Sequence, residues 1–253
     1  AFPVIFTVGI SLSDWSMTTG NAPQFVGLKN YIDMFKNQRF YNGIFLTFYL
    51  AVLSVSVETI LGVAIALMLH RDFIGKNIVK AILLLPMVST PVAIGLAWTL
   101  FYETIGLANY ALKQLGIPAV EWLSSSTTVI PAIALVDIWE WTPMVILICL
   151  AGLAGLPSEP FESARVDGAK PFQVLRHITL PMLYPTILTA ITLRSIDAFK
   201  TFDIIFTMTG GGPLYSSETL NIYAYKEGFG YFHFGSASSL LMSLFLVVLG
   251  CSF

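Results

Sequence analysis

The chain has 253 residues, of which 56% are hydrophobic and only 11% are charged, and its formal net charge is −2. A soluble domain carries about 25% charged residues, so this sequence has too little charge to cover a water-facing surface. The mean hydropathy of +0.77 and several long uncharged apolar stretches predict membrane-spanning helices. The composition excludes a soluble enzyme, a disordered regulator and a nucleic-acid binder, which would need a basic surface.

Apolar runs alternate with polar connections along the chain, and no strand-type alternation indicates a barrel. Residues 1–12 are apolar but too short to span a bilayer, and five longer runs follow. These are residues 44–69, a run ending near Phe101, and residues 129–154, 182–208 and 236–253. Pro86 and Pro91 predict a kink or break in the second of them. We expect an all-α, polytopic membrane protein with six transmembrane helices, forming one transmembrane domain over residues 1–253 with both ends truncated.

Lysine and arginine in short loops predict the orientation, because cytoplasmic loops carry an excess of them. The loops after the second and fourth spans hold six basic residues: Arg71, Lys76, Lys80, Arg165, Lys170 and Arg176. The two later loops on the other side hold only Lys113 and Lys226. The basic pair of loops is therefore expected in the cytoplasm, although Lys29, Lys36 and Arg39 would then lie outside.

The segment 155–181 between the fourth and fifth spans predicts two short helices joined by a turn. Ser158 is expected to cap the first helix, and Pro171 is expected to open the second. Asp167-Gly168 is typical of the turn between them. Such an elbow at the membrane surface suits docking into a groove of a soluble partner, whereas an ordinary structured loop is the alternative.

Three motifs in this elbow carry a family resemblance: Glu162-Ser163-Ala164, Asp167-Gly168-Ala169 and Ile178-Thr179-Leu180-Pro181. They resemble the EAA signature of the permease subunits of binding-protein-dependent ABC importers, with Ser163 in place of the first alanine. Phe25-Val26-Gly27-Leu28 and Thr209-Gly210-Gly211-Gly212-Pro213 are similar to the maltose-type, carbohydrate-transporting branch. The likeness covers nearly the whole chain.

The resemblance implies the type I ABC importer permease fold and a coupling helix near residues 161–170 that inserts into a cleft of a separate ATPase. The residues that it assigns to ATPase coupling are Glu162, Ser163, Ala164, Arg165, Asp167, Gly168 and Ala169. It implies a second homologous permease subunit, two ATP-binding subunits, an extracytoplasmic solute-binding protein and membrane lipid as partners, with no nucleic acid. The expected location is the bacterial or archaeal cytoplasmic (inner) membrane.

The sequence carries no motif for an energy source or a reaction centre. The only Gly-Lys pair, Gly75-Lys76, is followed by Asn77, so a GxxxxGK[ST] phosphate loop is missing. The histidines and the two cysteines are far apart and predict no catalytic set, disulfide or metal site. The chain is therefore expected not to be an enzyme and to bind no cofactor, with ATP and magnesium on the partner ATPases.

Seven charged residues are expected at membrane depth, where charge is costly and usually faces the bundle interior. They are Glu58, Asp137, Glu140, Arg194, Asp197, Lys200 and Asp203. Two stripes at i, i+3, i+4, i+7 spacing predict a wall of a sugar pathway, because carboxylates and guanidinium groups bind hydroxyls and an aromatic face covers a pyranose. The stripes are Asp137, Glu140, Trp141 and Met144, and Arg194, Asp197, Ala198 and Thr201. They coincide with the pocket helices that the resemblance implies.

Structural pairing of these charges is the alternative to a pathway. Local i, i+3 neutralisation would pair Arg194 with Asp197 and Lys200 with Asp203, and a structural role is favoured for Glu58, Lys200 and Asp203. The carried solute could also be a polyol or a glycerol-phosphate-like compound, since an arginine suits an anion. An ion-coupled secondary transporter is the rival from another class, and an intramembrane enzyme is a more distant one.

Overall fold

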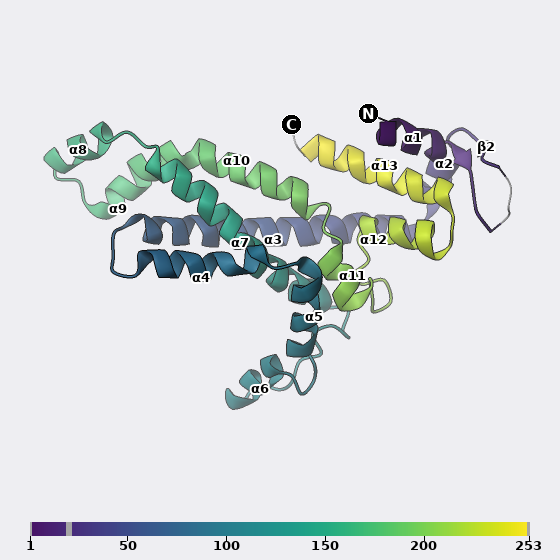
Figure 1. The fold of residues 1–253 in the computed structure, drawn as a ribbon, viewed down its shortest axis with the longest axis horizontal. Helices are drawn as coiled ribbons and strands as arrows, with labels where there is room; N and C mark the ends of the chain where they lie inside the picture. The colour runs from purple at the N-terminus through teal and green to yellow at the C-terminus, as the bar shows by residue number, and fades with distance from the viewer. Residues whose placement is uncertain (1, 19–21, 252–253) are drawn as a thin grey trace. The chain divides into compact units, whose positions relative to one another are not determined.

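Long apolar helices dominate the computed structural model, which describes residues 2–18 and 22–251 (Figure 1). Within these residues, four helices are long and apolar enough to cross a membrane: α3 (Gln38–His70), α7 (Val129–Ala154), the continuous segment Pro171–Ala198 and α13 (Phe234–Cys251). A bent pair of helices brings these candidate spans to five if the pair crosses the membrane as one broken span. The predicted all-α, polytopic class is confirmed.

The bent pair consists of α4 (Lys76–Val88) and α5 (Pro91–Phe101), with a bend of 97° at the break between them. The residue before a proline avoids the helical region, and Thr90 is accordingly extended, with φ −76° and ψ 136°. Pro91 then starts α5 at a position where its missing N–H costs nothing. The predicted break is confirmed, and Pro91 rather than Pro86 causes it, since Pro86 lies inside α4.

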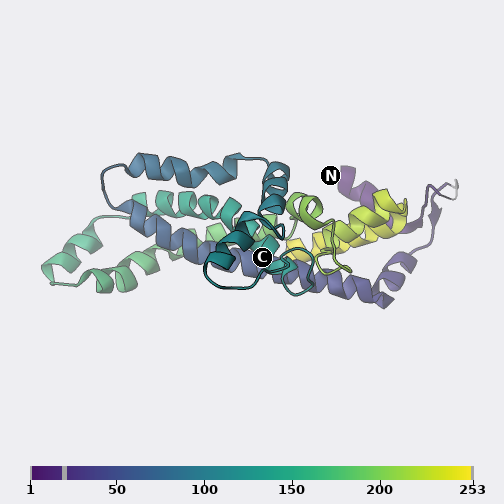
Figure 2. The ribbon, with the colours of Figure 1, turned by 90° about the horizontal axis from the view of Figure 1, so that it is seen from below.

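The N-terminal helix α1 (Phe2–Ser11) has 10 residues and is too short to span a bilayer, as predicted. It packs alongside α13, which both views show (Figures 1 and 2). The strands β1 (Ser13–Asp14) and β2 (Gln24–Phe25) then form a small antiparallel pair. With α1, the bent pair and the four long helices, the described residues are consistent with the six predicted helices.

Shorter elements connect the long ones. They are α2 (Lys29–Lys36), α6 (Leu107–Gln114), α8 (Glu159–Val166), α9 (Pro171–Val174), the π-helix η1 (Leu175–Thr179), α10 (Leu180–Ala198), α11 (Asp203–Thr209), α12 (Leu220–Tyr225) and the π-helix η2 (Lys226–Gly230). Pro171–Ala198 is thus α9, η1 and α10 in continuous succession.

The prediction of one uninterrupted span over residues 182–208 is wrong. Helix α10 ends at Ala198 and helix α11 begins at Asp203. The interruption is fixed by contacts distant in sequence: the Asn221 side-chain amide donates to the Lys200 carbonyl over 2.8 Å. Buried Phe199 packs edge-on against Phe48 with ring centroids 5.0 Å apart. These contacts hold an interruption that no glycine or proline signals.

The chain forms two compact units, each with its own apolar core. The first unit comprises Ala1–Leu53, Thr90–Val136 and Ile196–Phe253, and the second comprises Ser54–Ser89 and Asp137–Ser195. A core cluster of the first unit contains Met34, Phe40, Leu220, Tyr223, Ala224, Leu240 and Leu244. The core cluster of the second contains Ala66, Leu69, Val145, Ile146, Cys149, Leu153, Leu183 and Ala190.

Close packing of α3 against α7 in the second unit depends on Gly62. A Cβ added there would lie 2.5 Å from Val145 Cγ1. Because overpacking a filled core costs about 1–3 kcal/mol, we expect Gly62→Ala to lower the thermal unfolding midpoint in detergent. Gly9→Ala in α1 is the matched control, since an added Cβ there meets nothing within 4 Å. An unchanged midpoint in Gly62→Ala would refute the close contact.

Candidate functional site

A buried ion-pair cluster joins three helices of the second unit. Arg194 on α10 donates from Nε to Glu58 Oε2 on α3 over 2.6 Å and from Nη2 to Glu58 Oε1 over 3.1 Å. Its Nη2 also donates to Asp137 Oδ2 on α7 over 2.5 Å. All three side chains are at most 1% exposed. We call Glu58, Asp137 and Arg194 the charged triad.

Ion pairing within the triad offsets the free-energy cost of burying charged side chains within apolar helices. A guanidinium that binds one carboxylate with two hydrogen bonds gains both strength and fixed geometry. Removing one partner of a buried pair leaves an uncompensated charge, which is strongly destabilising. The triad therefore fixes α3, α7 and α10 to one another at this level of the second unit.

The structure pairs these charges differently from the local i, i+3 alternative of Arg194 with Asp197 and Lys200 with Asp203. Arg194 pairs across helices with Glu58 and Asp137, and Lys200 Nζ lies 3.1 Å from Asp197 Oδ1. The interruption after Ala198 removes the helical register between Lys200 and Asp203. A structural role for Glu58, favoured from the sequence, agrees with its ion pair.

The first predicted stripe lies along α7, which continues through Pro143. Asp137 and Glu140 are each 1% exposed, whereas Trp141 and Met144 are half-buried. The Trp141 ring lies 5.3 Å from Arg194 Cζ, within the range of a cation–π contact. The structure thus brings together Asp137, Trp141 and Arg194 of the two stripes.

The second predicted stripe is interrupted, because Thr201 follows the end of α10 and does not share its helical register. Ala198 is buried, and Asp197 and Thr201 are half-buried. These three residues belong to the first unit, and Arg194 belongs to the second. The expected i, i+3, i+4, i+7 alignment therefore holds only as far as Ala198.

The predicted elbow is present as α8, a turn and α9 (Figure 1). Gly168 has φ +71°, the left-handed conformation that glycine adopts without strain. The Gly168 N–H donates to the Arg165 carbonyl over 3.1 Å, and the Ala169 N–H donates to the Ala164 carbonyl over 2.9 Å. This pair of bonds is the Schellman motif, which ends a helix in a defined direction.

The start of α8 differs in detail from the prediction. Ser158 makes no side-chain cap, because its backbone is helical, with φ −79° and ψ −26°, rather than extended. Its carbonyl instead accepts from the N–H groups of Phe161 and Glu162, each over 3.0 Å. Glu159 and Glu162 place negative charge in the first turn, where it stabilises the helix by interacting with the positive end of the helix dipole.

The elbow presents most of the predicted coupling residues to the surface. The exposed ones are Glu162, Ser163, Arg165, Asp167 and Gly168. Ala169 is half-buried and Ala164 is only 7% exposed. A helix of 8 residues is not stable by itself in water, so α8 keeps its position through the turn and its buried side.

A second polar cluster, in the first unit, anchors the Gly-rich loop after α11, and sequence reasoning missed it. Arg39 donates to Glu218 with two hydrogen bonds, over 2.5 Å and 2.9 Å. Its guanidinium lies 4.6 Å from the Tyr215 ring and 4.1 Å from the Tyr223 ring. Lys226 Nζ approaches the same carboxylate at 2.8 Å. The one sequence signal was Arg39, a basic residue on the side expected to be poor in basic residues.

Comparison with known sequences gives the class of this protein. The family described as "Binding-protein-dependent transport system inner membrane component" matches residues 58–252. A probable ABC transporter permease of Sinorhizobium fredii is 38% identical over 252 residues, covering 99% of this chain and 81% of the relative. The trehalose/maltose transport system permease protein MalF of Thermococcus litoralis is 37% identical over 241 residues, covering 94% and 81%.

Solved structures share the fold. A bacterial ABC transporter involved in the import of the acidic polysaccharide alginate matches with a TM-score of 0.82 and 22% identity, covering 96% of this chain and 86% of that chain. The chain belongs to the permease family of binding-protein-dependent ABC importers, and its named relatives include sugar permeases. It is a multi-pass membrane protein of that family.

Proposed function

We propose that this chain is the transmembrane subunit of an ATP-driven importer that takes up a carbohydrate delivered by a solute-binding protein. The observation that carries the proposal is the exposed elbow, in which a Schellman turn at Gly168 ends a short helix bearing the EAA-like residues. A short helix with an exposed polar face and a fixed end suits insertion into a cleft of another subunit.

The proposed assembly contains a second homologous permease, two ATP-binding subunits and an extracytoplasmic solute-binding protein, in a bacterial or archaeal inner membrane. ATP and magnesium would be held by the ATP-binding subunits, and this chain would catalyse no reaction itself. The family description and a related alginate transporter structure, solved with a substrate-bound periplasmic protein, support this assembly. Glu162 and Arg165 would make polar contacts with the ATPase, with Ser163, Ala164, Asp167, Gly168 and Ala169 shaping the elbow.

The proposed substrate pathway keeps the residues predicted from the sequence: Asp137, Glu140, Trp141, Met144, Arg194, Asp197, Ala198 and Thr201. We propose different tasks for them. Asp137 and Arg194 bind each other, so in this conformation they position α7 and α10. Trp141 and Met144 retain exposed surface, and the Trp141 ring can cover the apolar face of a sugar ring.

A neutral carbohydrate fits the charge distribution better than a glycerol-phosphate-like solute. An anionic solute was considered because of Arg194, but that guanidinium is already bound by two carboxylates. Named relatives belong to transport systems for trehalose/maltose and for sulfoquinovosyl glycerol, and the latter carries an anionic sulfonate. The choice of a neutral solute therefore rests on the ion pairs of Arg194. Family membership disfavours the ion-coupled secondary transporter.

Co-purification tests the proposal. The tagged chain, extracted in mild detergent from its native membrane, is expected to bring with it a protein that carries a GxxxxGK[ST] phosphate loop. Uptake into vesicles is expected to require ATP. Uptake by the chain alone, driven by an ion gradient without ATP, would contradict the proposed function.

A further inference from the structure

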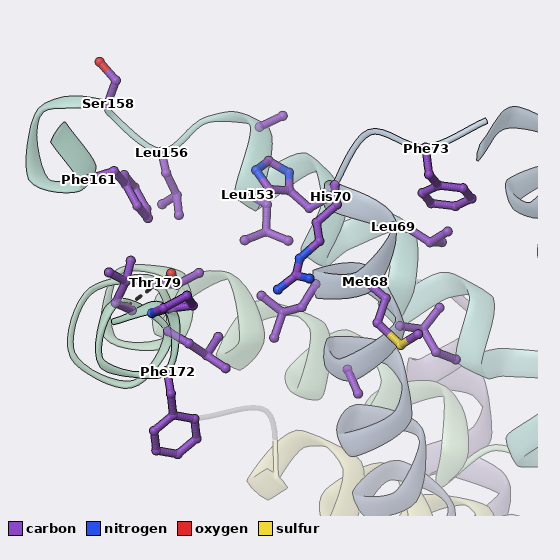
Figure 3. Close-up of a pocket in the computed structure, with 18 of the residues that line it drawn as sticks. Met68, Leu69, His70, Phe73, Leu153, Leu156, Ser158, Phe161, Phe172 and Thr179 are labelled. Carbon is purple, nitrogen blue, oxygen red and sulfur yellow. Dashed lines mark hydrogen bonds between the residues drawn. The ribbon is translucent and has the colours of Figure 1, made fainter. Parts of the chain in front are cut away.

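A large groove lies in the second unit between the elbow and the ends of three span helices (Figure 3). Its volume is about 1520 Å³. The elbow contributes Phe161 and Phe172, and the last two turns of α3 contribute Met68 and His70 (Figure 3). Helices α4 and α7 complete the lining with Leu83 and Leu153.

The groove wall is mainly apolar, and several of its apolar side chains are exposed. Met68 is 70% exposed, Phe172 is 69% exposed and Phe73 is 44% exposed. Burying apolar surface is worth about 25 cal/mol per Å², so a chain of methylene groups lying here would be stabilised. Because α3 and α7 are membrane-crossing helices by length and hydropathy, the groove opens at the end of the apolar spans.

Positive charge gathers at the same place. Arg71 and Arg165 line the groove together with His70, and both arginines are exposed. Among the described residues, neither arginine has a carboxylate within ion-pair distance. Asp72 forms an ion pair with Lys76 instead. Lys76 Nζ lies 3.0 Å from Asp72 Oδ1 and lowers the pKa of that carboxyl. Glu162 is the acidic residue of the lining, so the two arginines leave the lining with a net positive charge.

We propose that this groove binds one anionic phospholipid of the cytoplasmic leaflet. The phosphate would lie at Arg71, and an acyl chain would cover Met68, Leu83 and Leu153. The positive-inside rule places this end of the spans at the cytoplasmic leaflet, where basic pockets between transmembrane helices recognise anionic headgroups.

Lipid fits the groove better than a water-soluble subunit does. A soluble ATPase would meet the elbow from the aqueous side, whereas α3, α4 and α7 contribute the other side of the groove from their apolar spans. A bound lipid would contact both the elbow and the spans. The proposal goes beyond the importer function and does not depend on which solute is carried.

Native mass spectrometry of the purified, delipidated complex in detergent tests the site. The probes are dioleoyl phosphatidylglycerol and dioleoyl phosphatidylcholine, titrated separately. We expect phosphatidylglycerol to bind at a lower concentration, and Arg71→Gln to weaken its binding about fivefold, since a basic residue near an anionic headgroup contributes about 1 kcal/mol. Arg71→Lys is expected to retain most of the binding.

Two further variants separate the groove from the general surface. Lys80→Gln removes a nearby positive charge outside the groove lining and is expected to leave binding unchanged. Leu83→Trp fills the groove and is expected to weaken the binding of both lipids. Equal binding of the two lipids, or an unchanged Arg71→Gln, would overturn the proposal. A Met68→Cys variant that crosslinks to another subunit and not to a photoreactive lipid would also overturn it.

Discussion

Replacement of Arg194 with methionine is expected to destabilise the folded chain by about 3–5 kcal/mol, the cost of leaving a buried charge without its partner. Glu58 and Asp137 would remain as two acids of like charge, each at most 1% exposed. Methionine keeps much of the length of arginine and removes the guanidinium, so the loss reports charge more than volume. We expect little folded protein in the membrane and a much lower thermal unfolding midpoint in detergent.

The matched control for Arg194→Met is Lys200→Met. Lys200 also pairs with an acid, Asp197, but the two side chains are 53% and 45% exposed, and such pairs contribute about 0–1 kcal/mol. Adding Glu58→Gln and Asp137→Asn to Arg194→Met should restore part of the stability, because neutral amides remove the repulsion. An Arg194→Met protein as stable as the wild type would show that the triad does not hold these helices.

Replacement of Gly168 with aspartate is expected to abolish transport-coupled ATP hydrolysis while leaving membrane insertion intact. An added Cβ meets nothing within 4 Å in this chain, so the chain itself has room for the side chain. The effect is instead expected from the docking surface, where the substitution adds bulk and a negative charge to the turn that ends α8. The measurement is ATPase activity of the reconstituted complex, with the amount of the variant in the membrane measured in parallel.

Gly116 offers a matched control for Gly168→Asp. It has φ +74°, and an added Cβ there also meets nothing within 4 Å. Gly116→Asp therefore carries the same backbone cost, of about 1–2 kcal/mol at most, on the loop predicted to lie outside. It should keep coupled hydrolysis. Wild-type-like coupled hydrolysis in Gly168→Asp would contradict a docking role for the elbow.

The sequence predicted those parts of the fold that depend on neighbouring residues and not on contacts with distant parts of the chain. Apolar runs marked the spans, Pro91 marked the break between α4 and α5, and Asp167-Gly168 marked the turn of the elbow. The interruption between α10 and α11 was missed because it depends on Asn221, which binds the Lys200 carbonyl from a distant part of the chain. A hydropathy run cannot show such a contact.

The pairing of charges within the membrane was harder to predict for a similar reason. Helical spacing favours i, i+3 neighbours, but Arg194 binds Glu58, which is 136 residues away in the sequence. The sequence could mark Glu58 as an isolated acid in an apolar span without naming its partner. The elbow, by contrast, was predictable because its chemistry lies in one short segment, and its role in coupling stays a prediction, as does the sugar pathway.

The most direct test is ATP hydrolysis by the complete complex in proteoliposomes, with its cognate solute-binding protein and a panel of carbohydrates, amino acids and peptides. Stimulation by at least one carbohydrate, dependent on the binding protein, is the predicted result. Stimulation by an amino acid or peptide, with none by any carbohydrate, would contradict the account.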